Sequence, residues 1–152
     1  MKHVLILVIT LLLATYSFAQ NDKDKIDIVM DAWHKAAATA NEEVFFGSMT
    51  ADGIYLGTDK TEKWTRDEMK EWSKKYFERE SAWAFTAISR DVYFSENGNT
   101  AWFNEKLDTW MGICKGTGIL VNQNGEWKIA LYDLSVTVDN DKIQEFIELT
   151  KE

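Results

Sequence analysis

Two Asn-Gly pairs in the second half of the chain constrain its fold more than any other feature. The pairs Asn97-Gly98 and Asn124-Gly125 are typical of tight β-hairpin turns, in which the turn residues adopt a positive φ. Apolar and polar residues alternate in three segments around these turns: 101–111, 114–123 and 127–138. Alternation with a period of two is the pattern of a half-buried strand. The sequence therefore predicts a meander of antiparallel strands.

The first half of the chain has a helical period instead. Ile26, Met30, Trp33 and Ala37 recur at helical spacing and predict an amphipathic helix. Thr65 precedes Glu68 by three residues, which is the spacing of a capping box at a helix start. Helices followed by an antiparallel meander indicate an α+β fold. We expect a single domain over residues 25–150, with a curved antiparallel sheet packed as a cone on N-terminal helices and a C-terminal helix.

The N-terminus has the pattern of a secretory signal peptide. Lys2 and His3 precede an apolar run from Val4 to Ala14, and small residues follow at Ser17 and Ala19. This order predicts a signal at residues 1–19 and a secreted or periplasmic protein. The alternative is an uncleaved anchor, but the run to Ala19 is shorter than the roughly 20 residues that cross a bilayer.

Charge and the scarcity of cysteine and histidine exclude several kinds of site. The chain has a net charge of −8 without a basic cluster, which argues against nucleic acid and anionic membranes as partners. Cys114 is the only cysteine, so the chain has no intrachain disulfide. His34 is the only histidine left after signal cleavage. We predict no metal and no cofactor.

Several motifs resemble the nuclear transport factor 2-like superfamily, and within it the SnoaL-like group. The resemblance rests on four segments: Tyr55–Asp59 with Glu62 and Trp64, Ala101–Glu105, Gly116–Gly118, and Trp127–Ala130 with Leu134–Val136. It implies a curved sheet and helices that enclose a mostly apolar pocket, often in a homodimer. Members of the superfamily include polyketide cyclases, steroid isomerases, dehydratases and proteins without a shown activity, so the resemblance alone implies no single reaction.

The strand predicted over residues 101–111 carries the main candidate site. Trp102, Asp108 and Trp110 share one face of this strand. If that face lines the cone, two indole rings flank a carboxylate in a ligand pocket. If it is the outer face, the tryptophans lie in a dimer interface instead. Tyr55, Trp64 and Trp83 complete the aromatic residues that we expect to bind ligand.

Three residues are candidates for acid–base chemistry. Asp108 could act as a base if its tryptophan neighbours raised its pKa, or it could pair with a cation. Glu105 has the same phase as Phe103 and is the alternative inward-facing carboxylate. We expect Arg90 to be its ion-pair partner. Arg90 is also a further candidate for ligand binding. His34 titrates near neutrality when unperturbed, although a single histidine at a helix edge is more often structural.

The residues therefore favour a protein that binds a small apolar or amphipathic molecule. The alternatives are a proton-transfer enzyme (an isomerase, dehydratase or cyclase) with His34, Glu105 or Asp108 as base, and a homodimeric protein-interaction module. Asp59 and Glu62 are interpreted as turn and capping residues. Gly116 and Gly118 are interpreted as glycines that let a strand bend or pack closely.

Overall fold

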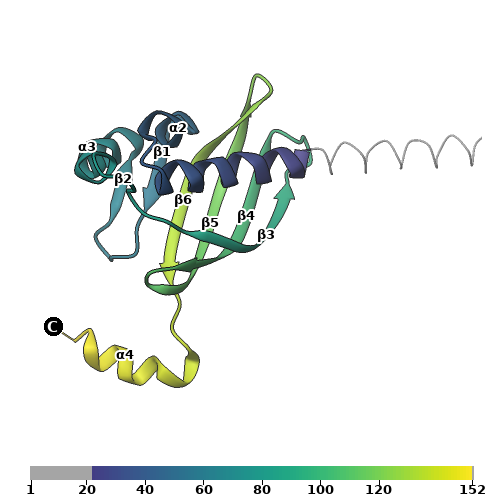
Figure 1. The fold of residues 1–152 in the computed structure, drawn as a ribbon. Coiled ribbons are helices and arrows are strands. Elements are labelled where there is room, and N and C mark those ends of the chain that lie inside the picture. Colours follow the sequence, from purple (N-terminus) through teal and green to yellow (C-terminus); the bar gives the residue numbers. More distant parts are fainter. Residues whose placement is uncertain (1–21, 152) are drawn as a thin grey trace, which may run out of the picture.

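A computed structural model describes residues 22–151 as one curved sheet wrapped against a long helix (Figure 1). The predicted signal peptide lies outside the described residues. The first helix covers residues 22–38 and crosses the concave face of the sheet. Two shorter helices follow it: α2 (Glu42–Gly47) and α3 (Arg66–Phe77). None of the helices in the described part of the chain is long and apolar enough to span a bilayer.

The sheet has six strands in the order β2-β1-β6-β5-β4-β3. Their bounds are β1 (Met49–Leu56), β2 (Lys63–Thr65), β3 (Thr86–Phe94), β4 (Thr100–Thr109), β5 (Gly112–Gln123) and β6 (Glu126–Val136). The predicted meander from β3 to β6 is confirmed as consecutive antiparallel pairs. One pair departs from the expected antiparallel sheet, because β1 lies parallel to β6.

A hairpin turn forms at each Asn-Gly pair, but the β3–β4 turn is longer than two residues, and of its pair only Gly98 has a positive φ. Asn124 and Gly125 both have positive φ, at 58° and 94°, as a two-residue hairpin turn requires. Thr65 accepts a hydrogen bond from the Glu68 backbone N–H at 3.3 Å, and Glu68 Oε2 accepts one from the Thr65 N–H at 2.8 Å. This reciprocal pair confirms the capping box and the start of α3.

The core lies between the first helix and the concave face of the sheet. Ile26, Met30 and Trp33 of the helix are at most 2% exposed. On β4, Phe103 and Leu107 are buried and face them. The α+β prediction with N-terminal helices on a curved sheet is therefore confirmed.

Two glycines of β5 allow side-chain and backbone atoms of other strands to approach closely. A Cβ at Gly116 would lie 2.5 Å from the Tyr132 hydroxyl, and one at Gly118 would lie 2.5 Å from the Leu131 carbonyl oxygen. The interpretation of these residues as close-packing glycines is confirmed.

The C-terminal helix α4 (Ile143–Leu149) follows the 3₁₀ turn η1 (Asn140–Lys142) and extends away from the sheet (Figure 1). Its apolar residues Ile143, Phe146 and Ile147 are 41–43% exposed. This helix was expected, and it forms, but it does not cover the core.

Candidate functional site

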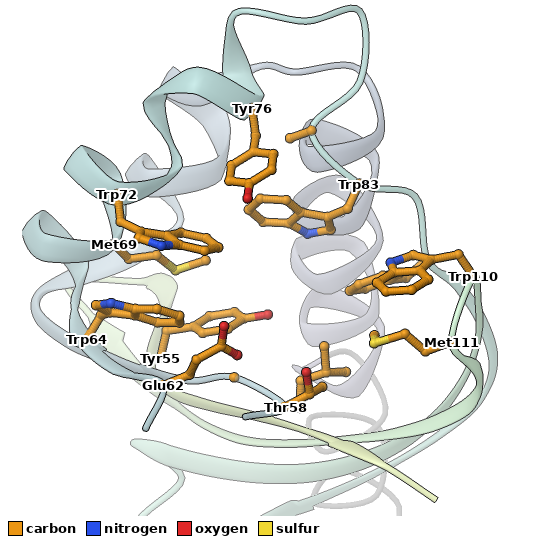
Figure 2. Close-up of a pocket in the computed structure, with 14 residues that line it drawn as sticks. Tyr55, Thr58, Glu62, Trp64, Met69, Trp72, Tyr76, Trp83, Trp110 and Met111 are labelled. Carbon is orange, nitrogen blue, oxygen red and sulfur yellow. The ribbon is translucent and has the colours of Figure 1, made fainter. Parts of the chain in front are cut away.

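A pocket of about 220 Å³ opens at one end of the sheet, between α3, the β1–β2 turn and the β4–β5 turn (Figure 2). Its walls are largely aromatic, with two methionines and few polar groups. The lining residues are Tyr55, Gly57, Thr58, Glu62, Trp64, Met69, Trp72, Tyr76, Ala82, Trp83, Phe85, Trp110, Met111 and Leu134. Enclosure by apolar side chains around a few polar atoms is the usual form of a small-molecule site.

Tyr55 forms part of the floor of the pocket. It points inward from β1, is 5% exposed and stacks on Tyr132 with 5.5 Å between ring centroids. Burial raises the pKa of Tyr55, and the negative charges of Glu62 and Asp133 raise it further. The Tyr55 hydroxyl therefore stays protonated and neutral at physiological pH.

An aromatic wall runs from β2 along α3. The Trp64 ring lies 4.7 Å from the Trp72 ring, and the Trp72 ring lies 5.2 Å from Tyr76. Trp72 and Tyr76 are four residues apart on α3, so both project from the same side of the helix. Trp83 continues the wall, with its ring 6.5 Å from Tyr76 in an edge arrangement.

Glu62 is the one charged residue among those that line the pocket. Its carboxylate points from the β1–β2 turn toward the aromatic side chains in Figure 2. A Cβ at Gly57 would lie 2.1 Å from Glu62 Oε2, so only glycine leaves room for this position. Glu62 Oε2 also accepts a hydrogen bond from the Asp59 N–H at 3.1 Å. Glu62 is thus a turn residue, as predicted, and also a lining residue.

The structure brings four of the predicted ligand-binding residues into this pocket: Tyr55, Trp64, Trp83 and Trp110. Trp110 belongs to the β4–β5 turn rather than to the strand, which is why its side chain reaches the pocket mouth while it stays 82% exposed. Arg90 and Trp102 do not line the pocket.

Trp102 and Asp108 lie on the outer face of the sheet, which corrects the placement that would put them inside the cone. Burial alternates along β4, and the buried phase contains Phe103, Glu105 and Leu107. Trp102 is 46% exposed and stacks on Tyr93 of the neighbouring strand, with 6.2 Å between ring centroids. Asp108 has the same exposed phase, so it is not positioned to act as a base in the pocket.

Glu105 is instead the inward-facing carboxylate, and it lies at the centre of a buried polar cluster. Its Oε1 lies 2.8 Å from His34 Nε2 and accepts a hydrogen bond from the Tyr132 hydroxyl at 3.0 Å. Its Oε2 accepts a hydrogen bond from Arg90 Nε at 3.0 Å. Arg90 also donates to Asp27 Oδ1 at 3.1 Å and Asp31 Oδ1 at 3.0 Å on the first helix.

This Glu105 cluster joins the first helix to the sheet and does not line the pocket. Burial by itself would raise the pKa of Glu105, but the hydrogen bonds and charges of His34 and Arg90 outweigh burial and hold the pKa below its usual range. A carboxylate that is ionised, buried and fully hydrogen-bonded is a weak base. The expected Arg90 partner of Glu105 is confirmed.

The lining residues that the sequence prediction missed as ligand contacts are mainly those of α3. Met69, Trp72 and Tyr76 have the spacing of an apolar stripe on one side of this helix, but Trp72 is 40% exposed, which is unusual for a stripe that only packs on a core. Within residues 22–151, no group of three His, Cys, Asp or Glu side chains is arranged to hold a metal ion.

Comparison with known families decides the classification. The family model described as a SnoaL-like domain matches residues 26–139. The chain belongs to the SnoaL-like family. No curated protein sequence matches this SnoaL-like domain significantly.

Solved structures share the fold of this SnoaL-like domain at low sequence identity. A protein of unknown function from Mycobacterium tuberculosis is 14% identical, with a TM-score of 0.67 over 90% of this chain and 83% of that one. An NTF2-like protein of unknown function from Pseudomonas putida is 10% identical, with a TM-score of 0.66 over 81% and 92%. A proposed dehydratase of the NTF2-like family from Streptomyces avermitilis is 14% identical, with a TM-score of 0.66 over 80% and 99%. These similarities confirm the nuclear transport factor 2-like fold.

Proposed function

We propose that this SnoaL-like domain is an exported protein that binds a small amphipathic molecule in the pocket beside α3. The aromatic lining of that pocket is the observation that carries the proposal. Six of its lining residues are Tyr or Trp, and they come from five separate segments of the fold. The signal-like pattern of residues 1–19 supports export.

The pocket supports binding better than proton transfer. Among the three predicted catalytic residues, Glu105 and His34 are engaged with each other at 2.8 Å, and none of the three lines the pocket. The carboxylate that does line it, Glu62, lies beside a tyrosine that burial keeps protonated. An isomerase or dehydratase that used His34, Glu105 or Asp108 would need that base within hydrogen-bond reach of its substrate, and none of the three lines this pocket.

The neutral fluorescent probe N-phenyl-1-naphthylamine tests the proposal. We expect the purified mature protein to bind it, with quenching of tryptophan emission and an increase in Tm. Trp72→Ala and Trp110→Ala should each weaken binding about 3- to 10-fold, because one aromatic contact contributes about 0.5–1.5 kcal/mol.

The matched control is Trp102→Ala, which removes an indole of similar exposure to Trp72 from the outer face. It should leave probe affinity unchanged. Absence of probe binding to the wild type, or equal losses in all three variants, would contradict the proposal.

We also propose that the outer face of the sheet pairs with the same face of a second copy. An apolar row crosses four strands in register: Tyr93 opposite Trp102, Trp102 opposite Ile119, and Ile119 opposite Leu131. Tyr93, Trp102 and Ile119 are 38–49% exposed. A contiguous exposed apolar row of this kind is a candidate interaction surface.

Charge and area support a second copy as the occupant of this outer face. Beside the apolar row, Asp91 and Asp133 share one cross-strand row, and Lys106 and Lys115 share the next. A two-fold axis can place the acidic row of one copy against the basic row of the other. Strands β3–β6 span about 20 Å by about 30 Å, or about 600 Å². Standard interfaces bury about 600–1,000 Å² per partner, so this face is at the lower end of that range.

Sedimentation velocity tests this pairing. We expect a dimer for the wild type and a monomer for Trp102→Glu, because the new carboxylate would be desolvated in the apolar row. Leu149→Glu, at an 85% exposed site on α4, is the control and should remain dimeric. A monomeric wild type, or dissociation caused by the α4 variant instead, would overturn the pairing.

A further inference from the structure

We propose that the pocket beside α3 selects an organic cation, namely an alkylated ammonium group that is held against indole rings with Glu62 as its counter-charge. This inference rests on the proposed small-molecule binding and specifies the chemical class of the ligand. Three features of the described residues support it: the arrangement of the aromatic rings, the sign of the charge in the pocket, and the way in which Glu62 is held.

The rings form an incomplete aromatic cage. Trp64, Trp72, Tyr76, Trp83 and Trp110 line one space together with Tyr55, and Figure 2 shows them on several sides of it. The face of an aromatic ring carries a negative partial charge, and indole attracts cations most strongly. Cages of this composition suit weakly hydrated ammonium groups, whose methyl groups also gain from apolar burial.

The charge of the pocket excludes anions. Its lining contains one carboxylate and no lysine or arginine. The chain as a whole has a net charge of −8, which attracts cations toward the opening at low ionic strength. An acidic ligand would have to approach Glu62 and the ring faces without a cationic partner among these lining residues. A hard metal ion would need several oxygen ligands, whereas aromatic carbons form most of these walls.

Glu62 is preorganised for this task. The absence of a side chain at Gly57 leaves space for its carboxylate, and the Asp59 N–H holds Oε2 at 3.1 Å. A carboxylate that is already in position loses little side-chain entropy when a ligand binds. Its neighbour Tyr55 remains protonated, because burial and the Glu62 charge both raise the Tyr55 pKa. Glu62 is therefore the single negative charge that the ligand meets.

The Tyr76 ring of this wall already has two cationic side chains of the protein beside it. Arg79 lies 4.8 Å from the Tyr76 centroid, and Lys75 Nζ lies 5.0 Å from it. Both cations are neighbours of Tyr76 in the sequence, at the end of α3 and just after it. These contacts leave the indoles of Trp64, Trp72, Trp83 and Trp110, rather than Tyr76, as the main contacts for a ligand.

Choline and its neutral isostere 3,3-dimethyl-1-butanol separate charge from shape. Titration calorimetry on the full mature protein should give an affinity for choline at least about tenfold higher than that for the alcohol. Glu62→Gln keeps the length of the side chain and an oxygen for the Asp59 N–H, and should reduce choline affinity about tenfold. The same variant should lower the ratio of choline affinity to alcohol affinity, because the alcohol carries no charge for Glu62 to balance.

Glu71→Gln is the matched control, because it makes the same change in net charge on an exposed position of α3 that does not line the pocket. It should retain the choline preference. If choline and the alcohol bind equally while the naphthylamine probe binds, the cation inference is overturned and the proposed binding function stands. If no probe binds, both are overturned. If choline binds equally to the wild type and to Glu62→Gln, the assignment of Glu62 as counter-charge is wrong.

Discussion

Replacing Glu105 by alanine is expected to lower the free energy of unfolding by about 3–5 kcal/mol, a large fraction of the stability of a domain of this size. The Glu105 side chain is fully buried, and Arg90, its ion-pair partner, is 5% exposed. Without the carboxylate, the guanidinium loses its buried counter-charge, and His34 and the Tyr132 hydroxyl lose their shared acceptor. Chemical denaturation monitored by tryptophan fluorescence measures the loss.

Other variants of the Glu105 cluster separate charge from packing. Glu105→Gln keeps the volume of the side chain and should still destabilise, because Arg90 then keeps only the more exposed carboxylates of Asp27 and Asp31. Tyr132→Phe removes one hydrogen bond and should cost about 1 kcal/mol. Asp31 also pairs with Arg90 but is 68% exposed, so Asp31→Asn should change the free energy of unfolding only slightly. If the Glu105→Gln protein were as stable as the Asp31→Asn protein, the charge of Glu105 would not stabilise the contact between the first helix and the sheet.

The pH dependence of stability gives a second readout for Glu105. Its pKa is lower in the folded protein than in the unfolded chain, so its contribution is complete above the unfolded-state pKa of about 4.3. The contribution decreases as the pH falls below that value and through the lower folded-state pKa. The wild type should therefore lose stability in this acidic range, and Glu105→Gln should lose less.

Replacing Gly118 by alanine is expected to destabilise the protein by about 3 kcal/mol, at the upper end of the usual cost of overpacking. The new Cβ would lie 2.5 Å from the Leu131 carbonyl oxygen and 2.6 Å from the Phe103 ring. The carbonyl belongs to the backbone of β6, which is paired with β5, so it cannot rotate away as a flexible side chain would. Thermal and chemical unfolding of the variant measure the effect.

Gly47→Ala is the control for this prediction. Gly47 ends α2, and nothing lies within 4 Å of the position that its Cβ would occupy. The substitution should be neutral or stabilise by up to about 1 kcal/mol, because alanine restricts the unfolded chain more than glycine does. Equal losses at Gly47 and Gly118 would show that contact with Leu131 is not the cause.

Local sequence predicts most of the elements, because the signals act within a few residues. The hairpin at Asn124-Gly125 and the capping box at Thr65 both form as their sequences indicate. The apolar phase of residues 83–94 switches near Ala87–Arg90, which is typical of a bulge, and the β3–β4 register shifts there, between Ala87 and Ser89. In β1 the apolar alternation is clear only from Ile54, whereas the strand begins at Met49. The residues from Met49 to Gly53 lack the alternation that would reveal a strand.

The sequence by itself determined the α+β order of elements, the SnoaL-like family and most of the aromatic residues of the pocket. Alternation along residues 101–111 separates two faces of a strand, but both faces carry large apolar side chains, so it does not say which face is covered. Only the tertiary structure decided that Glu105 points inward and Trp102 outward, because the first helix covers one side of the sheet. It alone also placed Glu62 among indoles from α3 and the β4–β5 turn, since contacts between distant segments depend on how the whole sheet curves.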